Sequence, residues 1–168
     1  MAEIILVTGG ASSGKSVRAE TVTRSYPGRP IYIATAEITD DEMAGRIAAH
    51  RERRGEDWEL WETPLDLEAT LARTDGRGPR LVECLTVWLS NLMYHGRDWA
   101  VDVSALTSAL SRQTTPVILV SNEVGLGIVP DNALAREFLR AAGHLNQQIA
   151  ACASKVEFVV AGLPLRLK

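Results

Sequence analysis

The chain is poor in cysteine, has no excess of positive charge and contains no long apolar run, and each absence excludes a class of protein. Only Cys84 and Cys152 are present, and their spacing matches neither a metal site nor a redox motif. We therefore expect two buried thiols in a reducing compartment. The formal net charge is −3 and the sequence pI is about 5.6, which argues against a broad nucleic-acid surface.

The sequence also lacks the features of an exported or membrane protein. Its N-terminus has no basic region followed by a long apolar one, as a signal peptide would. No stretch approaches the roughly 20 apolar residues of a membrane-spanning helix. No repeat, low-complexity tract or linker divides the chain, and 46% of its residues are hydrophobic, close to an average globular protein. We therefore expect a cytoplasmic protein without a membrane span, whose 168 residues (1–168) form a single domain.

The most informative segment is a glycine-rich run at 9–16 that matches the pattern G-x-x-x-x-G-K-[ST]. A β-branched, apolar run at 4–8 precedes it and predicts a buried strand, and a helix is predicted over 15–24. A strand, a turn and a helix are the context that a phosphate-binding loop requires, whereas a chance match in a glycine-rich turn would not need these flanks. We expect the backbone N–H groups of the loop to bind a nucleoside triphosphate. Lys15 would reach its β- and γ-phosphate oxygens, and Ser16 would hold Mg²⁺.

Strand-like runs alternate with helix-like runs along the rest of the chain. Strands are predicted at 4–8, 31–35, 59–62, 80–84, 116–121 and 156–161, with an alternating edge strand at 163–168. Helices are predicted at 15–24, 39–54, 65–72, 86–94, 102–112 and 132–153. This alternation predicts an α/β fold of the P-loop NTPase, RecA-like type: a three-layer sandwich with a mainly parallel sheet, helices on both faces and a C-terminal edge strand.

Two further strand ends carry polar residues at the edge where such sheets bind ligands. Glu83 ends an apolar strand, which is where P-loop proteins position the acid that binds Mg²⁺ through water. The alternative is that Glu83 merely starts the next helix. The run 121–130 begins Ser-Asn-Glu and contains two glycines, which predicts a mobile loop near the ligand. An ordinary connection is the alternative for any single residue of that run.

His50 lies on the helix predicted over 39–54, with Arg46, Arg53 and Arg54 close to it on one face. Nearby arginines would disfavour a charged imidazole and keep the ring neutral, which is the form that can attack phosphorus. They could also bind phosphate oxygens. A lone histidine is weak evidence for catalysis, so the residues alone favour the simpler interpretation that His50 is a surface residue on a solvated basic helix.

Taken together, these segments resemble the bifunctional adenosylcobinamide kinase/adenosylcobinamide-phosphate guanylyltransferase family of cobalamin biosynthesis, over nearly the whole chain. The resemblance rests on the segments 7–16, 32–36, 41–50, 83–92, 121–130 and 161–164. The loop at 121–130 and the segment that ends at His50 are far more specific than the phosphate loop, which many unrelated NTPases share. Family members often have arginine in place of Ser12, and many have aspartate in place of Glu83. The first change removes a potential phosphate contact.

The resemblance implies two reactions. One is phosphorylation of adenosylcobinamide by ATP or GTP, and the other is transfer of GMP from GTP to adenosylcobinamide phosphate, with release of pyrophosphate. His50 falls on the family's guanylylated histidine, so His50 and Lys15 are the expected catalytic residues and Ser16 and Glu83 the expected Mg²⁺ ligands. The expected nucleotide contacts are Gly9, Gly10, Ala11, Ser12, Ser13, Gly14, Lys15, Ser16, Ala34, Thr35, Ala36, Arg51, Glu52, Arg53, Arg54, Glu62 and Glu83. A homo-oligomer is also implied, with a trimer expected, in which subunits complete one another's clefts.

Without the family resemblance, the residues predict only a Mg²⁺-dependent P-loop phosphotransferase that acts on a small molecule. A small-molecule kinase without nucleotidyl transfer is therefore the first alternative. A nucleotide-sensing module, whose output is a protein contact, is the second, and it would bind nucleotide without turnover. A nucleic-acid ATPase is disfavoured by the acidic charge balance, so no nucleic-acid partner is expected.

Overall fold

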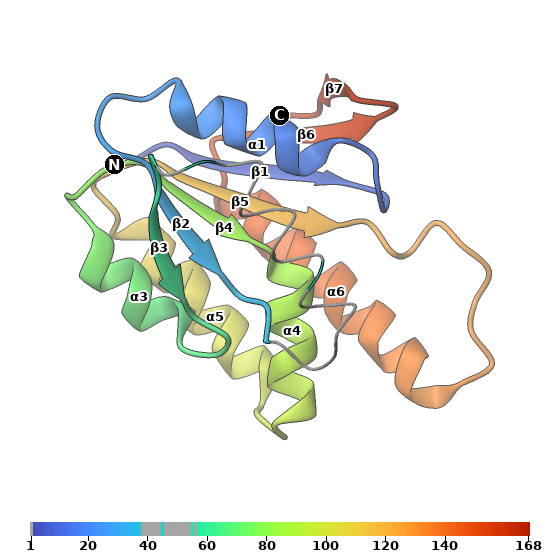
Figure 1. Cartoon of the computed structure of the whole chain (residues 1–168). Helices are drawn as coiled ribbons and strands as arrows, with labels where there is room; N and C mark the ends of the chain where they lie inside the picture. The colour runs from blue at the N-terminus through green and yellow to red at the C-terminus, as the bar shows by residue number, and fades with distance from the viewer. Residues whose placement is uncertain (1, 38–44, 46–54, 56) are drawn as a thin grey trace.

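The computed structural model describes residues 2–37, 45, 55 and 57–168. Within them the chain forms a seven-stranded sheet in the order β3-β2-β4-β5-β1-β6-β7 (Figure 1). Neighbouring strands run parallel, except that β6 and β7 form an antiparallel pair at one edge. The strands are β1 (Ile4–Gly9), β2 (Ile31–Ala34), β3 (Glu59–Glu62), β4 (Arg80–Glu83), β5 (Val117–Asn122), β6 (Lys155–Val160) and β7 (Leu163–Arg166).

Helices cover both faces of the sheet (Figure 1). Among the described residues, α1 (Lys15–Arg24) covers one face, and four helices pack on the other face. These are α3 (Leu67–Thr74), α4 (Leu85–Tyr94), α5 (Trp99–Ser111) and α6 (Ala133–Cys152). Across the part of the chain that the structure describes, no helix has the length and apolar character needed to span a membrane.

The central strands have apolar side chains on both faces, which is why helices must cover both sides. All residues of β1 are buried. In β5, Val117 and Leu119 pack in the larger core with α3, α4, α5 and α6. Ile118 and Val120 pack in a second core on the opposite face, with Ala19 of α1. Successive strand residues point to opposite faces, so the two cores follow from the continuous apolar runs of the middle strands.

The predicted α/β architecture is confirmed, with its mainly parallel sheet, helices on both faces and C-terminal edge strand. Two helices begin more than one residue away from the predicted position. α5 begins at Trp99 rather than at 102, because the Asp98 carboxylate accepts hydrogen bonds from the backbone N–H groups of Ala100 at 3.1 Å and Val101 at 3.4 Å. α3 begins at Leu67 rather than at 65.

The two cysteines lie in different environments. Cys84 is buried, and this burial, together with the charge of the adjacent Glu83, raises the pKa of its thiol to about 11. The prediction that Cys152 is also buried is wrong, because its side chain is exposed. Cys152 is the last residue of α6, and Ala153 takes the buried position at this end of the helix.

Candidate active site

The carboxyl ends of the parallel strands meet along one edge of the sheet, and several of the predicted site residues lie there. Gly9 at the end of β1 is in register with Asn122 at the end of β5. Ala34 at the end of β2 is in register with Glu83 of β4 on one side and Glu62 of β3 on the other. Open parallel sheets bind their ligands at this edge, so the strand order brings together residues that are far apart in the sequence.

The loop between β1 and α1 requires glycine at two positions. Gly14 has a φ of 94°, and a Cβ atom there would lie 3.1 Å from the Gly162 Cα. A Cβ atom at Gly9 would lie 2.5 Å from the Val159 carbonyl oxygen. Because Gly14 is the N-cap residue of α1, the loop ends on the free N–H groups of a helix N-terminus, which favour an anion.

Lys15 is the first residue of α1, and its side chain lies under the loop with only 8% of its surface exposed. Its Nζ donates a hydrogen bond to the Gly10 carbonyl oxygen at 3.0 Å. Among the described residues we find no ion pair for this ammonium group. The cation is therefore held in place by the loop itself, with its charge available to a bound anion.

Ser16 and Glu83 come together across the gap between α1 and β4. The Ser16 hydroxyl donates a hydrogen bond to Glu83 Oε1 at 2.8 Å, although 67 positions separate the two residues in the sequence. A hydroxyl and a carboxylate oxygen are the hard oxygen ligands that Mg²⁺ prefers. The two residues predicted to hold Mg²⁺ are thus neighbours beside the phosphate loop.

Three predicted nucleotide contacts lie at the end of β2, and the side chain of one of them, Thr35, has a structural role. Ala34, Thr35 and Ala36 follow one another at this strand end, and Thr35 has no exposed surface. The Thr35 hydroxyl accepts a hydrogen bond from the Cys84 N–H at 2.8 Å and donates one to the Cys84 carbonyl at 2.8 Å, which holds the ends of β2 and β4 together. Glu62, at the end of the edge strand β3, is exposed.

Five of the predicted residues cannot be placed in the same way. His50, Arg51, Glu52, Arg53 and Arg54 lie outside the described residues, as does the rest of the helix predicted over 39–54 except residue 45. Their proximity to the phosphate loop stays a prediction.

A polar network on the α4 and α6 side of β5 was not predicted from the sequence. The Ser121 hydroxyl donates to Asn146 Oδ1 at 2.6 Å, and Asn146 Nδ2 donates to the Asn122 carbonyl at 3.3 Å. The Thr86 hydroxyl accepts from the Asn122 N–H at 2.7 Å. Thr86 follows Glu83 by three positions, so its place just after a predicted strand could have marked it as a site residue. Asn146 lies within α6, and no local sequence pattern distinguishes it from the other polar residues of that helix.

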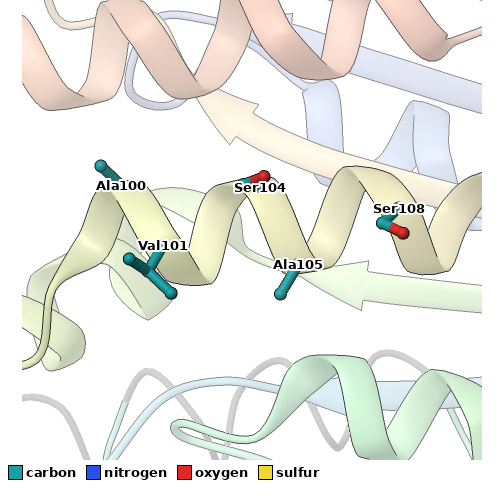
Figure 2. A pocket seen from close by; sticks show the side chains of 5 residues that line it. All are labelled: Ala100, Val101, Ser104, Ala105 and Ser108. Carbon is teal, nitrogen blue, oxygen red and sulfur yellow. The ribbon is translucent and has the colours of Figure 1, made fainter.

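An open hollow elsewhere on the molecule has no such chemistry (Figure 2). It has a volume of about 520 Å³ and is lined by one helix, α5, through Ala100, Val101, Ser104, Ala105 and Ser108. Methyl groups and two hydroxyls carry no charge that could bind a triphosphate. The candidate site therefore lies at the carboxyl edge of the sheet.

Comparison with known proteins identifies relatives that match over almost the full chain. The model of the family described as cobinamide kinase / cobinamide phosphate guanyltransferase matches residues 5–167. The bifunctional adenosylcobalamin biosynthesis protein CobP of Pseudomonas aeruginosa is 46% identical, over 97% of this chain and 96% of its own length. The bifunctional adenosylcobalamin biosynthesis proteins CobU of Salmonella typhimurium and Escherichia coli are 42% and 40% identical, each over 98% of this chain and 99% of their own length.

Solved structures with a similar fold are much more distant in sequence. The P4 protein of bacteriophage phi6, solved in complex with ADP, is 16% identical with a TM-score of 0.53, and the match covers 98% of this chain and 54% of that one. A protein of Pyrococcus horikoshii OT3 is 11% identical with a TM-score of 0.55, covering 99% of this chain and 86% of that one. At these identities the likeness concerns the fold alone, and it agrees with the predicted RecA-like, P-loop NTPase architecture.

Proposed function

This chain belongs to the cobinamide kinase / cobinamide phosphate guanyltransferase family, and we propose how its residues divide the two reactions between them. The enzyme phosphorylates adenosylcobinamide, and it transfers GMP from GTP to adenosylcobinamide phosphate in cobalamin biosynthesis. The observation that carries the residue assignment is the 2.8 Å contact of Ser16 with Glu83 beside the buried Lys15.

In the kinase reaction, the loop from Gly9 to Gly14 binds the triphosphate of ATP or GTP through backbone N–H groups. The adenosylcobinamide hydroxyl oxygen attacks the γ-phosphorus and its proton is released to solvent, while the bond from the γ-phosphorus to the bridging oxygen breaks and the nucleoside diphosphate leaves. Lys15 reaches the β- and γ-phosphate oxygens and stabilises the charge that builds up there in the transition state. Its low exposure supports this role, because a charge acts more strongly where water is excluded.

Ser16 and Glu83 would hold Mg²⁺ at this site, and the residues present fit the ion. Mg²⁺ is usually bound by one or two carboxylates together with substrate phosphates and water. Among the described residues there is no group of three or more His, Cys, Asp or Glu that could hold a metal without such help. When bound with the nucleotide, Mg²⁺ would offset the charge of the phosphate oxygens.

In the guanylyltransferase reaction, we assign the nucleophile to His50. A neutral imidazole nitrogen attacks the α-phosphorus of GTP, the bond to the bridging oxygen breaks, and pyrophosphate leaves. The GMP group, now bonded to nitrogen, passes to a phosphate oxygen of adenosylcobinamide phosphate, which frees the imidazole. The family resemblance supports this role and further nucleotide contacts from Ala34, Thr35, Ala36, Arg51, Glu52, Arg53, Arg54 and Glu62.

The test uses GTP labelled at the α-phosphate and the purified full-length chain. We expect acid-labile, base-stable label on the protein, which is the signature of a phosphorus–nitrogen bond. His50→Ala should abolish the label while leaving phosphorylation of adenosylcobinamide in place. His144→Ala is the matched control and should keep the label, since the His144 ring, on α6, packs edge-to-face against Trp99 of α5.

Product masses separate this function from its closest alternative. Adenosylcobinamide with GTP should yield the phosphorylated form and then the form that carries GDP. A wild-type protein that gives only the phosphorylated form, and takes no label from GTP, would be a kinase without nucleotidyl transfer. Loss of label in His144→Ala but not in His50→Ala would contradict the assignment of the nucleophile.

We also propose that the enzyme works as a homotrimer. Four apolar residues in and after the connection between β5 and α6 support a subunit contact, because they are exposed to between 66% and 97%: Leu126, Ile128, Val129 and Leu134. Light scattering, which measures molar mass in solution, should give three times the mass of the chain. A monomer at micromolar concentration would contradict the proposal.

A further inference from the structure

The direction of the Asn122 side chain follows from the alternation along β5. Val117 and Leu119 face the core that α4 and α6 cover, and Ser121 continues this series, since its hydroxyl contacts Asn146 of α6. Ile118 and Val120 face the opposite core, on the α1 side. Asn122 is next in that second series, so its carboxamide lies on the face of the sheet that carries α1 and the phosphate loop.

Glu83 lies on the same face by the same reasoning. In β4, Leu81 packs in the core on the α1 side and Val82 in the opposite one. The hydrogen bond from Ser16 of α1 to Glu83 shows that the alternation continues to the strand end. Since β5 lies between β1 and β4, Asn122 stands between the phosphate loop and the carboxylate.

The backbone of Asn122 is held by side chains from two helices. Its N–H donates to Thr86 at 2.7 Å, and its carbonyl accepts from Asn146 at 3.3 Å. Thr86 is 8% exposed, and Ser121, which binds Asn146, is 2% exposed. The following residue, Glu123, donates its N–H to the Gly9 carbonyl at 3.0 Å, which ties this strand end to the start of the phosphate loop.

The side chain of Asn122, in contrast, makes no hydrogen bond that we find within the described residues, although it is half-buried. A carboxamide has two N–H donors and no charge. Because it lies between the phosphate loop and Glu83, it can donate a hydrogen bond to a phosphate oxygen without the charge repulsion that a second carboxylate would cause.

We propose that the Asn122 carboxamide donates a hydrogen bond to the terminal phosphate of the bound triphosphate, and that Thr86 and Asn146 are positioning residues that fix its backbone. This inference rests on the proposed function, because it requires a nucleotide in the phosphate loop. The contact exists only while the γ-phosphate is present, so it distinguishes a triphosphate from a diphosphate.

The experiment measures the dissociation constants of a non-hydrolysable GTP analogue and of GDP, each with Mg²⁺. Asn122→Ala should weaken binding of the analogue about tenfold and leave GDP binding unchanged, since one hydrogen bond to a charged group is lost. Asn122→Asp keeps the shape but adds a negative charge, and it should weaken the analogue further. Asn146→Ala should reduce the preference for the analogue by a smaller factor, since Thr86 still holds the N–H.

Asn132→Ala is the matched control. Asn132 caps α6 by accepting from the Ala135 N–H at 3.1 Å, so its loss lowers stability without touching the strand end. The ratio of the two dissociation constants should stay at the wild-type value. An unchanged ratio in Asn122→Ala and Asn122→Asp, with tight binding by the wild type, would overturn this inference alone. A wild type that binds neither nucleotide would overturn the proposed function as well.

Discussion

At the start of β4, Arg80 has no exposed surface and its guanidinium donates to four other residues of the chain. At the carboxyl edge, Lys15 is almost as deeply buried, yet within the described residues its ammonium group makes a single hydrogen bond, to the Gly10 carbonyl. Both cations are removed from water, and they differ in how much of their bonding capacity the protein uses. A buried cation with few protein partners retains capacity for a ligand, whereas one surrounded by acceptors contributes to the fold.

The acceptors around Arg80 come from α3, from the residue that follows α3 and from the segment between α5 and β5. Its guanidinium donates to the Leu71 carbonyl at 3.0 Å, to the Thr115 carbonyl at 2.6 Å, to Asp75 Oδ1 at 2.9 Å and to the Gln113 side chain. Burial lowers the pKa of Arg80, and the charge of Asp75 opposes that change. This group therefore joins α3, β4 and the segment before β5 into one unit.

The largest effect should come from removing the cation at the carboxyl edge. Lys15→Met keeps the aliphatic length and loses the charge, so kcat/KM of the kinase reaction should fall about 1,000-fold, in the range seen when a group that stabilises transition-state charge is removed. The free energy of unfolding should change by less than about 1 kcal/mol, because only one hydrogen bond to a carbonyl is lost. Product formation and urea unfolding on the same samples measure the two quantities. A large loss of stability with full activity would show that Lys15 stabilises the fold and does not act on the substrate, which is the role assigned here to Arg80.

The next effect should come from removing the cation at the start of β4. Arg80→Met leaves the Asp75 carboxylate and the Gln113 amide without their buried partner, which should lower the free energy of unfolding by about 3 kcal/mol. The kinase kcat/KM of the folded protein should match that of the wild type, since Arg80 lies at the opposite end of β4 from Glu83. Urea unfolding, and activity measured well below the transition, check both statements. Equal stability of the variant and the wild type would show that the network is not needed for the fold.

The sequence predicted those parts of the molecule whose signals are local. The spacing of the motif G-x-x-x-x-G-K-[ST] is enough to predict that Gly14, Lys15 and Ser16 lie where the phosphate loop meets α1. Continuous apolar runs identify β1 and β5 as inner strands of the sheet. The cap at Asp98 is also a local signal, and it accounts for the three residues by which α5 begins before the predicted position.

Other features depend on strand order, which no local pattern specifies. The position of β5 between β1 and β4 puts Asn122 next to the phosphate loop, and only the topology shows this. Asn146 lies 24 positions after Asn122 and belongs to a helix, so its role appears only once the two elements are packed. The partners of Arg80 are similarly remote, since Gln113 and Thr115 are 33 and 35 positions away.

The smallest predicted effect is a pH dependence of stability that comes from Asp75, the ion-pair partner of Arg80. Burial alone would raise the pKa of Asp75, but hydrogen bonds from Thr114 and Thr115 and the charge of Arg80 together lower it from 3.8 to about 2. A carboxyl group with a lowered pKa in the folded state stabilises the fold above its unfolded pKa, and this stabilisation is lost as pH falls through the folded pKa. Asp75 should therefore contribute about 2 kcal/mol at pH 6, and this contribution should disappear between about pH 4 and pH 2.

Asp75→Asn isolates this contribution from those of other acidic groups, because Glu3 and Glu157 also have lowered pKa values and remain in both proteins. The difference in unfolding free energy between the wild type and Asp75→Asn, measured with urea at several pH values, should be largest at pH 6 and shrink by about 2 kcal/mol by pH 2. Kinase activity of the variant at pH 7 should equal that of the wild type, since no residue of the phosphate loop contacts Asp75. A difference in stability that stays constant from pH 6 to pH 2 would show that Asp75 is not held as a charged partner of Arg80, and the contrast between the two ends of the sheet would then lose its electrostatic basis.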